Sequence, residues 1–162
     1  MQSPPDPNHP PIPEMVGATS DPFPIRAVPT FISFDVHAPT GPALIRDDRM
    51  PRTAHLGIEN ITGKVNVPQF AVYLNLPEGS DPARHPFRYA GSLPMFGLVE
   101  MSQVRGHHPA SGLTYRFDVT NVLLRLAVLK EWDARTLRVT FIPEPWPQPA
   151  EAQVGRVSLY FQ

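Results

Sequence analysis

The sequence predicts a mainly β protein, an antiparallel β-sandwich of about seven or eight strands with one short helix. Three observations support this fold class. Apolar and polar residues alternate over many short segments, turn-forming residues separate those segments, and a helical period occurs only once. Alternation of period two places one face of each strand in a core, and the short turns allow neighbouring strands to pair antiparallel.

The alternating segments follow one another through most of the chain. The expected strands cover residues 31–39, 54–61, 69–77, 89–101, 113–119, 136–143 and 154–162. The fourth of these contains Pro94 and Gly97, which are typical of an edge strand, a bulge or a bend. Between strands lie loops rich in Gly, Pro, Asp and Ser, including PEGSDPARHPF and VRGHHPASG.

The one helix is expected after the strand LTYRFDV, where the period of the apolar residues changes. The residues that recur at helical spacing are Val119, Leu123, Leu126 and Leu129. Thr120 is placed to cap the first free amides of this helix. Asp118 and Asn121 are expected to hydrogen-bond the backbone at the same strand-to-helix junction.

The N-terminal part of the chain has a different composition. Twelve of the 22 prolines lie at or before Pro51, and the opening MQSPPDPNHPPIPE lacks the apolar periodicity of a packed segment. We therefore expect residues 1–30 to form an extended Pro-rich arm or linker and residues 31–162 to form the sandwich domain.

Composition excludes several classes of function. The net charge is −1 and no cluster of Lys and Arg is present, which argues against a nucleic-acid partner. No apolar run approaches the ~20 residues that span a bilayer, and no N-terminal signal pattern is present. We expect no membrane partner, and a location in the cytoplasm or export together with a partner. The absence of cysteine removes disulfides and thiolate chemistry.

The six histidines do not have the spacing of a dinuclear copper centre. Such a centre needs pairs of His on facing helices, whereas these are scattered over loops and strand ends. The one candidate metal site joins the adjacent His107 and His108 with Met101, whose thioether would favour Cu(I). Because two or three such ligands bind weakly, no tightly bound cofactor is expected.

No catalytic residue is predicted, because Ser, Asp and His do not occur in a recognisable nucleophile or acid–base pattern. The segment LPMFG instead suggests contact with another protein. Met95 and Phe96 lie between a proline and a glycine and could protrude from a bend into a partner's pocket. The alternative is that both side chains pack into the core of this domain.

The order of segments resembles the C-terminal domain of polyphenol oxidases and bacterial tyrosinases, which plant enzymes mark with a KFDV-type motif. The matching segments are GIENITG, AVYLNLP, YAGSLPMFG, LTYRFDVTNVLLRL, LRVTFIP and VGRVSLYFQ, within residues 54–162. EMVGAT, residues 14–19, looks like the linker after the copper domain. In that family a six-His helical domain oxidises phenols to quinones, and the sandwich covers its entrance, with a side chain that can occupy the cavity.

The copper domain has no counterpart in this sequence, so the resemblance implies a non-catalytic accessory role. We expect the domain to dock on a tyrosinase-like copper oxidase chain, shield its site and support its stability or latency, with copper held by the partner. One alternative is a copper-delivery chaperone that uses Met101, His107 and His108. Another is a free-standing binding module, for which Trp132 and Trp146 could supply a stacking surface.

Overall fold

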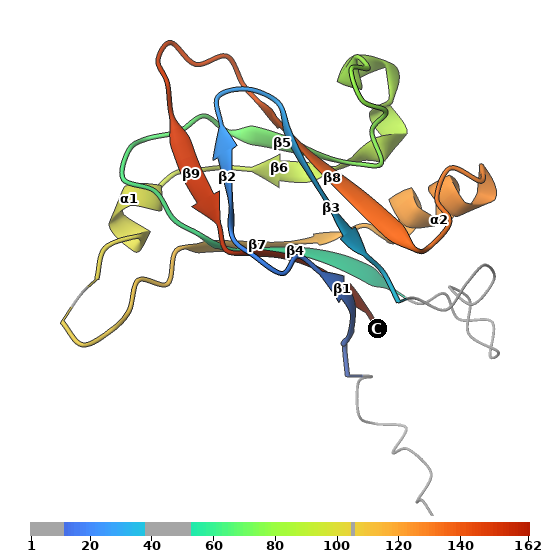
Figure 1. Ribbon diagram of the computed structural model, residues 1–162, viewed down its shortest axis with the longest axis horizontal. Helices are drawn as coiled ribbons and strands as arrows, with labels where there is room; N and C mark the ends of the chain where they lie inside the picture. The colour runs from blue at the N-terminus through green and yellow to red at the C-terminus, as the bar shows by residue number, and fades with distance from the viewer. Residues whose placement is uncertain (1–11, 38–52, 105) are drawn as a thin grey trace, which may run out of the picture.

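The computed structural model describes residues 12–37, 53–104 and 106–162, so the first eleven residues, His9 among them, and most of the loop before residue 54 lie outside the described part. The described residues form two antiparallel four-stranded sheets and a two-stranded ribbon (Figure 1). The strands are β1 (Glu14–Ala18), β2 (Phe23–Arg26), β3 (Thr30–Asp35), β4 (Ala54–Ile61), β5 (Phe70–Leu74), β6 (Tyr89–Leu93), β7 (Leu113–Asp118), β8 (Thr136–Pro143), β9 (Glu151–Val154) and β10 (Arg156–Phe161).

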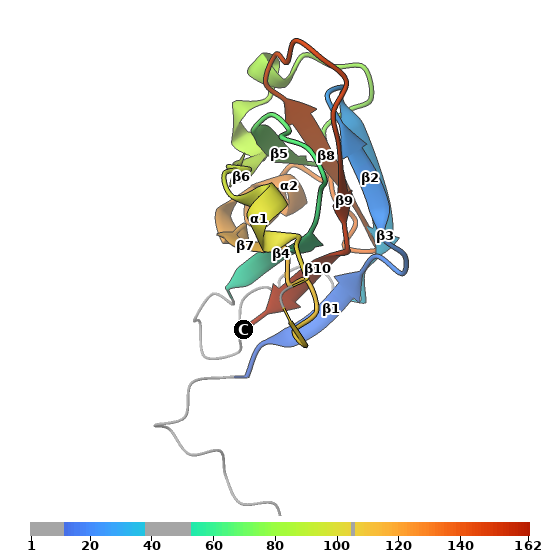
Figure 2. The ribbon, with the colours of Figure 1, turned by 90° about the vertical axis from the view of Figure 1, so that its left-hand side faces the viewer.

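The two larger sheets pack face to face and make a sandwich, which confirms the predicted fold class. The strand order is β1-β10-β4-β7 in one sheet and β3-β8-β5-β6 in the other, and β2 pairs with β9 in the ribbon. We call the first the β10 sheet and the second the β8 sheet. Figure 2 shows the layers from the side, with β2 and β9 closing one flank.

The core consists of the inward residues of both sheets, as the alternation of the sequence predicts. Leu56, Ile58 and Leu159 of the β10 sheet are fully buried, and they face Phe141 and other apolar residues of the β8 sheet. The outward residues of the same strands are largely polar or half-exposed. A Cβ at Gly91 on β6 would lie 2.4 Å from the ring of Phe117 on β7, so glycine lets this ring pack over the edge between the sheets.

Two short α-helices lie at opposite ends of the sandwich (Figure 1). These are α1 (Leu98–Met101) and α2 (Thr120–Val128), and the segment between β5 and β6 adds two 3₁₀ turns, η2 (Pro82–Arg84) and η3 (Pro86–Arg88). Within the described residues, no helix has the length and apolar character needed to cross a membrane.

The strand count and the arm differ from the sequence-based expectation. Residues 14–18 and 23–26, expected in the arm, form β1 and β2, and most of β9 lies between the strands expected at 136–143 and 154–162, where no strand was expected. β1 is part of the β10 sheet because Glu14–Ala18 pairs with β10 more than a hundred residues later. The composition of a segment does not indicate so distant a pairing partner. The proline content therefore led to the wrong assignment of residues 14–18 to the arm. The segment 89–101 ends its strand at Leu93 and continues as α1.

The junction between β7 and α2 corrects the predicted cap. The Asp118 carboxylate accepts hydrogen bonds from the Thr120 N–H (3.0 Å) and the Thr120 hydroxyl (2.6 Å). These bonds, and the nearby charge of His55, lower the pKa of Asp118. The Thr120 hydroxyl itself accepts from the Ala54 N–H at 2.8 Å. The N-cap residue is Val119, and the Asp118 carboxylate, one residue earlier, caps the first amide of α2, as its expected backbone role indicated. Thr120 instead ties the helix to β4.

A buried arginine fixes the other end of α2. Arg88 of η3 is 4% exposed, and its guanidinium donates to the Asn75 carbonyl (2.5 Å) and to the Glu131 carboxylate just after the helix. The Asn75 side chain donates in turn to the Glu131 carbonyl. A buried charge requires such partners, so this network holds the end of α2 against the β5–β6 segment.

Candidate functional site

The bend after β6 separates the two candidate contact residues. Met95 points into the core and is 8% exposed, whereas the next side chain, Phe96, is 96% exposed. Gly97 follows with φ of 79°, a left-handed conformation that glycine adopts without strain. Residues 94–97 thus form a rigid corner that presents one benzyl group to solvent.

Contacts beneath the corner hold it in place. Leu98, the first residue of α1, is buried, and a Cβ at Gly63 would lie 2.7 Å from its Cδ2 atom. The Ser102 hydroxyl accepts from the Gly63 N–H (2.9 Å) and donates to the Leu98 carbonyl (2.5 Å). The Tyr115 hydroxyl donates to the Pro94 carbonyl. These bonds tie α1 to the segment after β4 and to β7, so the position of Phe96 is set by the body of the sandwich.

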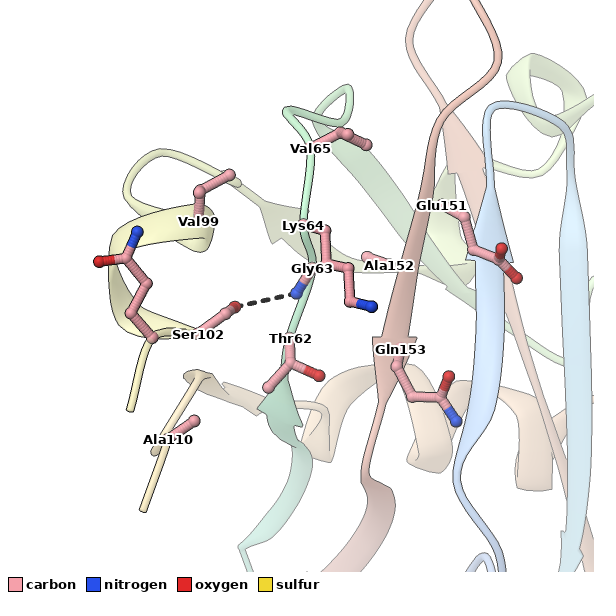
Figure 3. Close-up of a pocket in the computed structure, with 11 residues that line it drawn as sticks. Thr62, Gly63, Lys64, Val65, Val99, Ser102, Ala110, Glu151, Ala152 and Gln153 are labelled. Carbon is pink, nitrogen blue, oxygen red and sulfur yellow. Dashed lines mark hydrogen bonds between the residues drawn. The ribbon is translucent and has the colours of Figure 1, made fainter. Parts of the chain in front are cut away.

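A groove of about 880 Å³ runs beside α1 (Figure 3). One wall comes from α1 and the residues after it, the other from the segment after β4 and from β9. The lining residues are Thr62, Gly63, Lys64, Val65, Val99, Ser102, Gln103, Ala110, Glu151, Ala152 and Gln153. Figure 3 shows Val65 and Val99 at one end of the groove and the Lys64 side chain extending toward β9.

Four exposed apolar residues lie in the segments that flank this groove, although others are spread over the rest of the described surface. Phe96, Met101 and Val104 come from α1 and its flanks, and Val65 comes from the facing segment, where it is 50% exposed. We call these four residues the α1 surface. Among the charged residues beside it, Glu151 pairs with Arg26 of β2 at 3.0 Å. The arrangement offers apolar contact with a charged rim, which is the usual composition of a protein-binding surface.

The predicted metal ligands lie in the same part of the chain. His107 and His108 are exposed in the segment between α1 and β7, and Met101 is 44% exposed at the end of α1. The described residues contain no group of three or more His, Cys, Asp or Glu that could hold a metal ion. Copper binding by Met101, His107 and His108 stays a prediction.

The two tryptophans, which the binding-module alternative invokes together, are in different environments. Trp132 is 6% exposed after α2, and its Nε1 donates to the Thr136 carbonyl at 3.1 Å. Trp146, in the loop before β9, is 36% exposed. The two side chains therefore do not form one stacking surface.

Comparison with known proteins places the chain in a family. Residues 12–162 match the family described as "Domain of unknown function (DUF7868)". The chain belongs to this family. The matched range begins two residues before β1 and includes every strand described above, so the DUF7868 domain is the whole sandwich rather than residues 31–162 alone.

The relatives are a tyrosinase and polyphenol oxidases, of which this domain matches only a part. Tyrosinase HcTyr1 of Hahella sp. (strain CCB-MM4) is 27% identical over 152 residues, which are 91% of this chain and 32% of that protein. A recombinant latent aurone synthase (polyphenol oxidase), co-crystallized with hexatungstotellurate(VI), matches with a TM-score of 0.51 and 20% identity, over 86% of this chain and 25% of its own.

A second structure of recombinant latent aurone synthase gives a TM-score of 0.50 at 19% identity, again over 86% of this chain and 26% of that one. These solved structures share the fold. The DUF7868 domain thus spans about a third of the length of the curated relative. The resemblance predicted from the order of segments is confirmed: the chain is similar to one domain-sized part of tyrosinase and polyphenol oxidase chains.

Sequence reasoning missed part of the α1 surface. Val65 and Val104 lie in segments interpreted as loop, where single valines carry no periodic signal. The sequence also did not decide which of the Met95 and Phe96 side chains points into the core. The proline and glycine around them break the alternation that would place each side chain on the inner or outer face. Gly97 was the residue in the sequence that could have indicated the corner itself, since a glycine after two large apolar residues favours a sharp corner.

Proposed function

We propose that the DUF7868 domain is a non-catalytic shield for a tyrosinase-like type 3 copper phenol oxidase. It docks through the α1 surface, and Phe96 enters the entrance of the partner's active site. The observation that carries the proposal is the exposure of Phe96, which is 96% exposed at the apex of a corner held by buried neighbours. Because the backbone of this corner is already ordered, a partner pocket that encloses the ring has little backbone entropy to remove.

Two further observations support a role in contact rather than in chemistry. The likeness to a tyrosinase and to latent polyphenol oxidases extends over a domain-sized part of those chains. In the described residues, the α1 surface and its groove hold apolar, amide, hydroxyl and single charged groups. The Ser102 hydroxyl donates to the Leu98 carbonyl rather than to a base. We assign the contact role to Phe96 rather than to Met95, because the Met95 side chain is 8% exposed and packs in the core.

The first experiment captures the partner with the full 162-residue chain. The tagged chain is used to retrieve proteins from its native host, and the product is analysed by mass spectrometry, copper content and catechol oxidation. The expected result is a copper protein in fixed stoichiometry whose oxidase activity rises when the complex is opened. Recovery of the chain alone, or with proteins that lack copper and oxidase activity, would overturn the proposal.

The second experiment tests Phe96 in the captured complex. Phe96→Ala is expected to raise catechol oxidation while the complex still assembles through the rest of the α1 surface. Phe31→Ala is the matched control, because Phe31 is also an exposed phenylalanine but lies on β3 of the other sheet. Equal activity of the two variants and the parent would exclude Phe96 as the group that shields the site.

A further inference from the structure

A second hollow lies on the outer face of the β8 sheet, away from α1. It has a volume of about 430 Å³, within the usual range of small-molecule sites. Its floor is formed by outward residues of β3 and β8, and its wall by the loop after β5. The lining residues are Pro29, Thr30, Phe31, Leu76, Pro77, Glu78, Gly79, Ser80, Pro82, Arg138, Thr140 and Ile142. We call it the β8 groove.

A cation and an aromatic ring are combined on the floor of the β8 groove. The Arg138 guanidinium carbon lies 4.8 Å from the centroid of the Phe31 ring, a cation–π contact that orients the guanidinium. Within the described residues, this guanidinium has no ion pair and no hydrogen-bonded side chain. Its N–H groups are therefore available to an acceptor that enters the groove.

The remaining walls favour a flat apolar ligand. Three prolines, Leu76 and Ile142 supply apolar surface, and Thr140 on the floor carries a hydroxyl beside the ring of Phe31, with which it is paired in register. The wall loop is fixed by its own bonds, since the Ser80 hydroxyl donates to the Pro77 carbonyl at 2.6 Å. The groove is thus formed before any ligand binds. Glu78 lies exposed on this loop, and Arg138 is the one cationic residue among the lining residues, so Arg138 is the group that can pair with an anion.

We propose that the β8 groove binds a small aromatic carboxylate, with the ring in the apolar channel beside Phe31 and the carboxylate on the Arg138 guanidinium. Planar bidentate pairing makes carboxylate the natural partner of a guanidinium held in one orientation. This proposal is independent of the shielding function, because it uses other residues and another sheet.

The probe is 4-hydroxybenzoate, added to the full chain and followed by amide chemical shifts in ¹H–¹⁵N spectra. Saturable shifts are expected at Phe31, Gly79 and Thr140. The neutral analogue 4-hydroxybenzamide is expected to bind about tenfold more weakly, because a charge-assisted hydrogen bond is lost. Cyclohexanecarboxylate is expected to bind more weakly than benzoate, because its aliphatic ring has no π-face to pack against the Phe31 ring.

Two variants and their controls complete the test. Arg138→Gln is expected to weaken 4-hydroxybenzoate binding about tenfold, whereas Arg156→Gln, on the outer face of the other sheet, leaves it unchanged. Phe31→Ala is expected to weaken it several-fold, with Phe96→Ala as control. The proposal is overturned if the parent chain shows no saturable shifts, if the acid and the amide bind equally, or if Arg138→Gln binds as the parent does.

Discussion

The described part of the sandwich has two junctions in which a strand leads into an α-helix. The surfaces that these two junctions present to solvent differ in polarity. At β7–α2 the polar groups are paired: Asp118 caps the helix, and Arg88 bonds to Glu131 beyond its end. At β6–α1 the backbone is held just as firmly, but the apex side chain, Phe96, is left in solvent. Both junctions are anchored by buried leucines, Leu126 and Leu98 respectively.

The difference distinguishes side chains that stabilise the fold from a side chain that the fold exposes to solvent. A junction that served stability alone would place its largest apolar side chain inward, since burial of a phenylalanine stabilises by about 1.5–3 kcal/mol. The β6–α1 corner buries Met95 and Leu98 and leaves Phe96 outside. We interpret this exposed side chain as retained for binding.

The largest effect is expected when either anchor is truncated. Leu98→Ala and Leu126→Ala each remove a fully buried side chain and are expected to lower the free energy of unfolding by about 2–5 kcal/mol. Urea denaturation measures both. If Leu98→Ala cost less than a third as much as Leu126→Ala, the α1 corner would not be anchored as firmly as α2, and the comparison would fail.

The next effect concerns the buried arginine beside α2. Arg88→Met removes the bonds to the Asn75 carbonyl and to Glu131, and it is expected to lower the free energy of unfolding by about 2 kcal/mol. Arg84→Met is the control, because Arg84 is an exposed arginine of the neighbouring 3₁₀ turn. Equal stability of the two variants would show that this network contributes nothing beyond packing.

A smaller effect, with a pH dependence, is expected at the cap of α2. Asp118→Ala is expected to cost about 1 kcal/mol at neutral pH. The pKa of Asp118 is lower in the folded state, so the carboxylate stabilises the fold above its unfolded pKa, and this contribution is lost as the pH falls through the folded pKa.

Asp118→Asn separates charge from hydrogen bonding, because the amide oxygen can still accept from the Thr120 N–H. Thermal melts between neutral pH and about pH 3 are expected to converge for the parent and Asp118→Asn as the pH falls. A constant difference between them across this range would contradict the assigned role of the Asp118 charge.

The smallest effect on stability is expected at the exposed residues themselves. Phe96→Ala and Val128→Ala are both expected to change the free energy of unfolding by less than about 0.5 kcal/mol, because neither side chain is packed. A loss of several kcal/mol in Phe96→Ala would show that this ring is part of the fold, and the contrast between the two junctions would disappear.

The sequence predicts those elements whose signal is local. Residues 54–61 alternate through Ala54, Leu56 and Ile58 and form β4, and the helical spacing from Val119 onward corresponds to α2. β2 and β9 were missed because each is short and reads as turn or linker, with Pro24 in β2 and polar residues in β9. Their pairing across more than a hundred residues decides their structure, and local propensity does not encode it.

For the candidate site, the sequence indicates the segment but not the direction of its side chains. LPMFG suggested a protruding corner, yet only the packed structure shows Met95 inward and Phe96 outward. The β8 groove had no sequence signal at all. Phe31 and Arg138 are 107 positions apart, and they meet because β3 and β8 pair in a register that places them diagonally.

The position of β10 has a consequence for how the chain folds during synthesis. β10 lies between β1 and β4, so Ala18 obtains its partner, Ser158, only after 140 further residues have been made. Until then, both strands have an open edge to which another chain could add. Pairing over such a separation also slows folding. A shortened chain that ends before residue 156 is therefore expected to aggregate rather than to form a smaller sandwich.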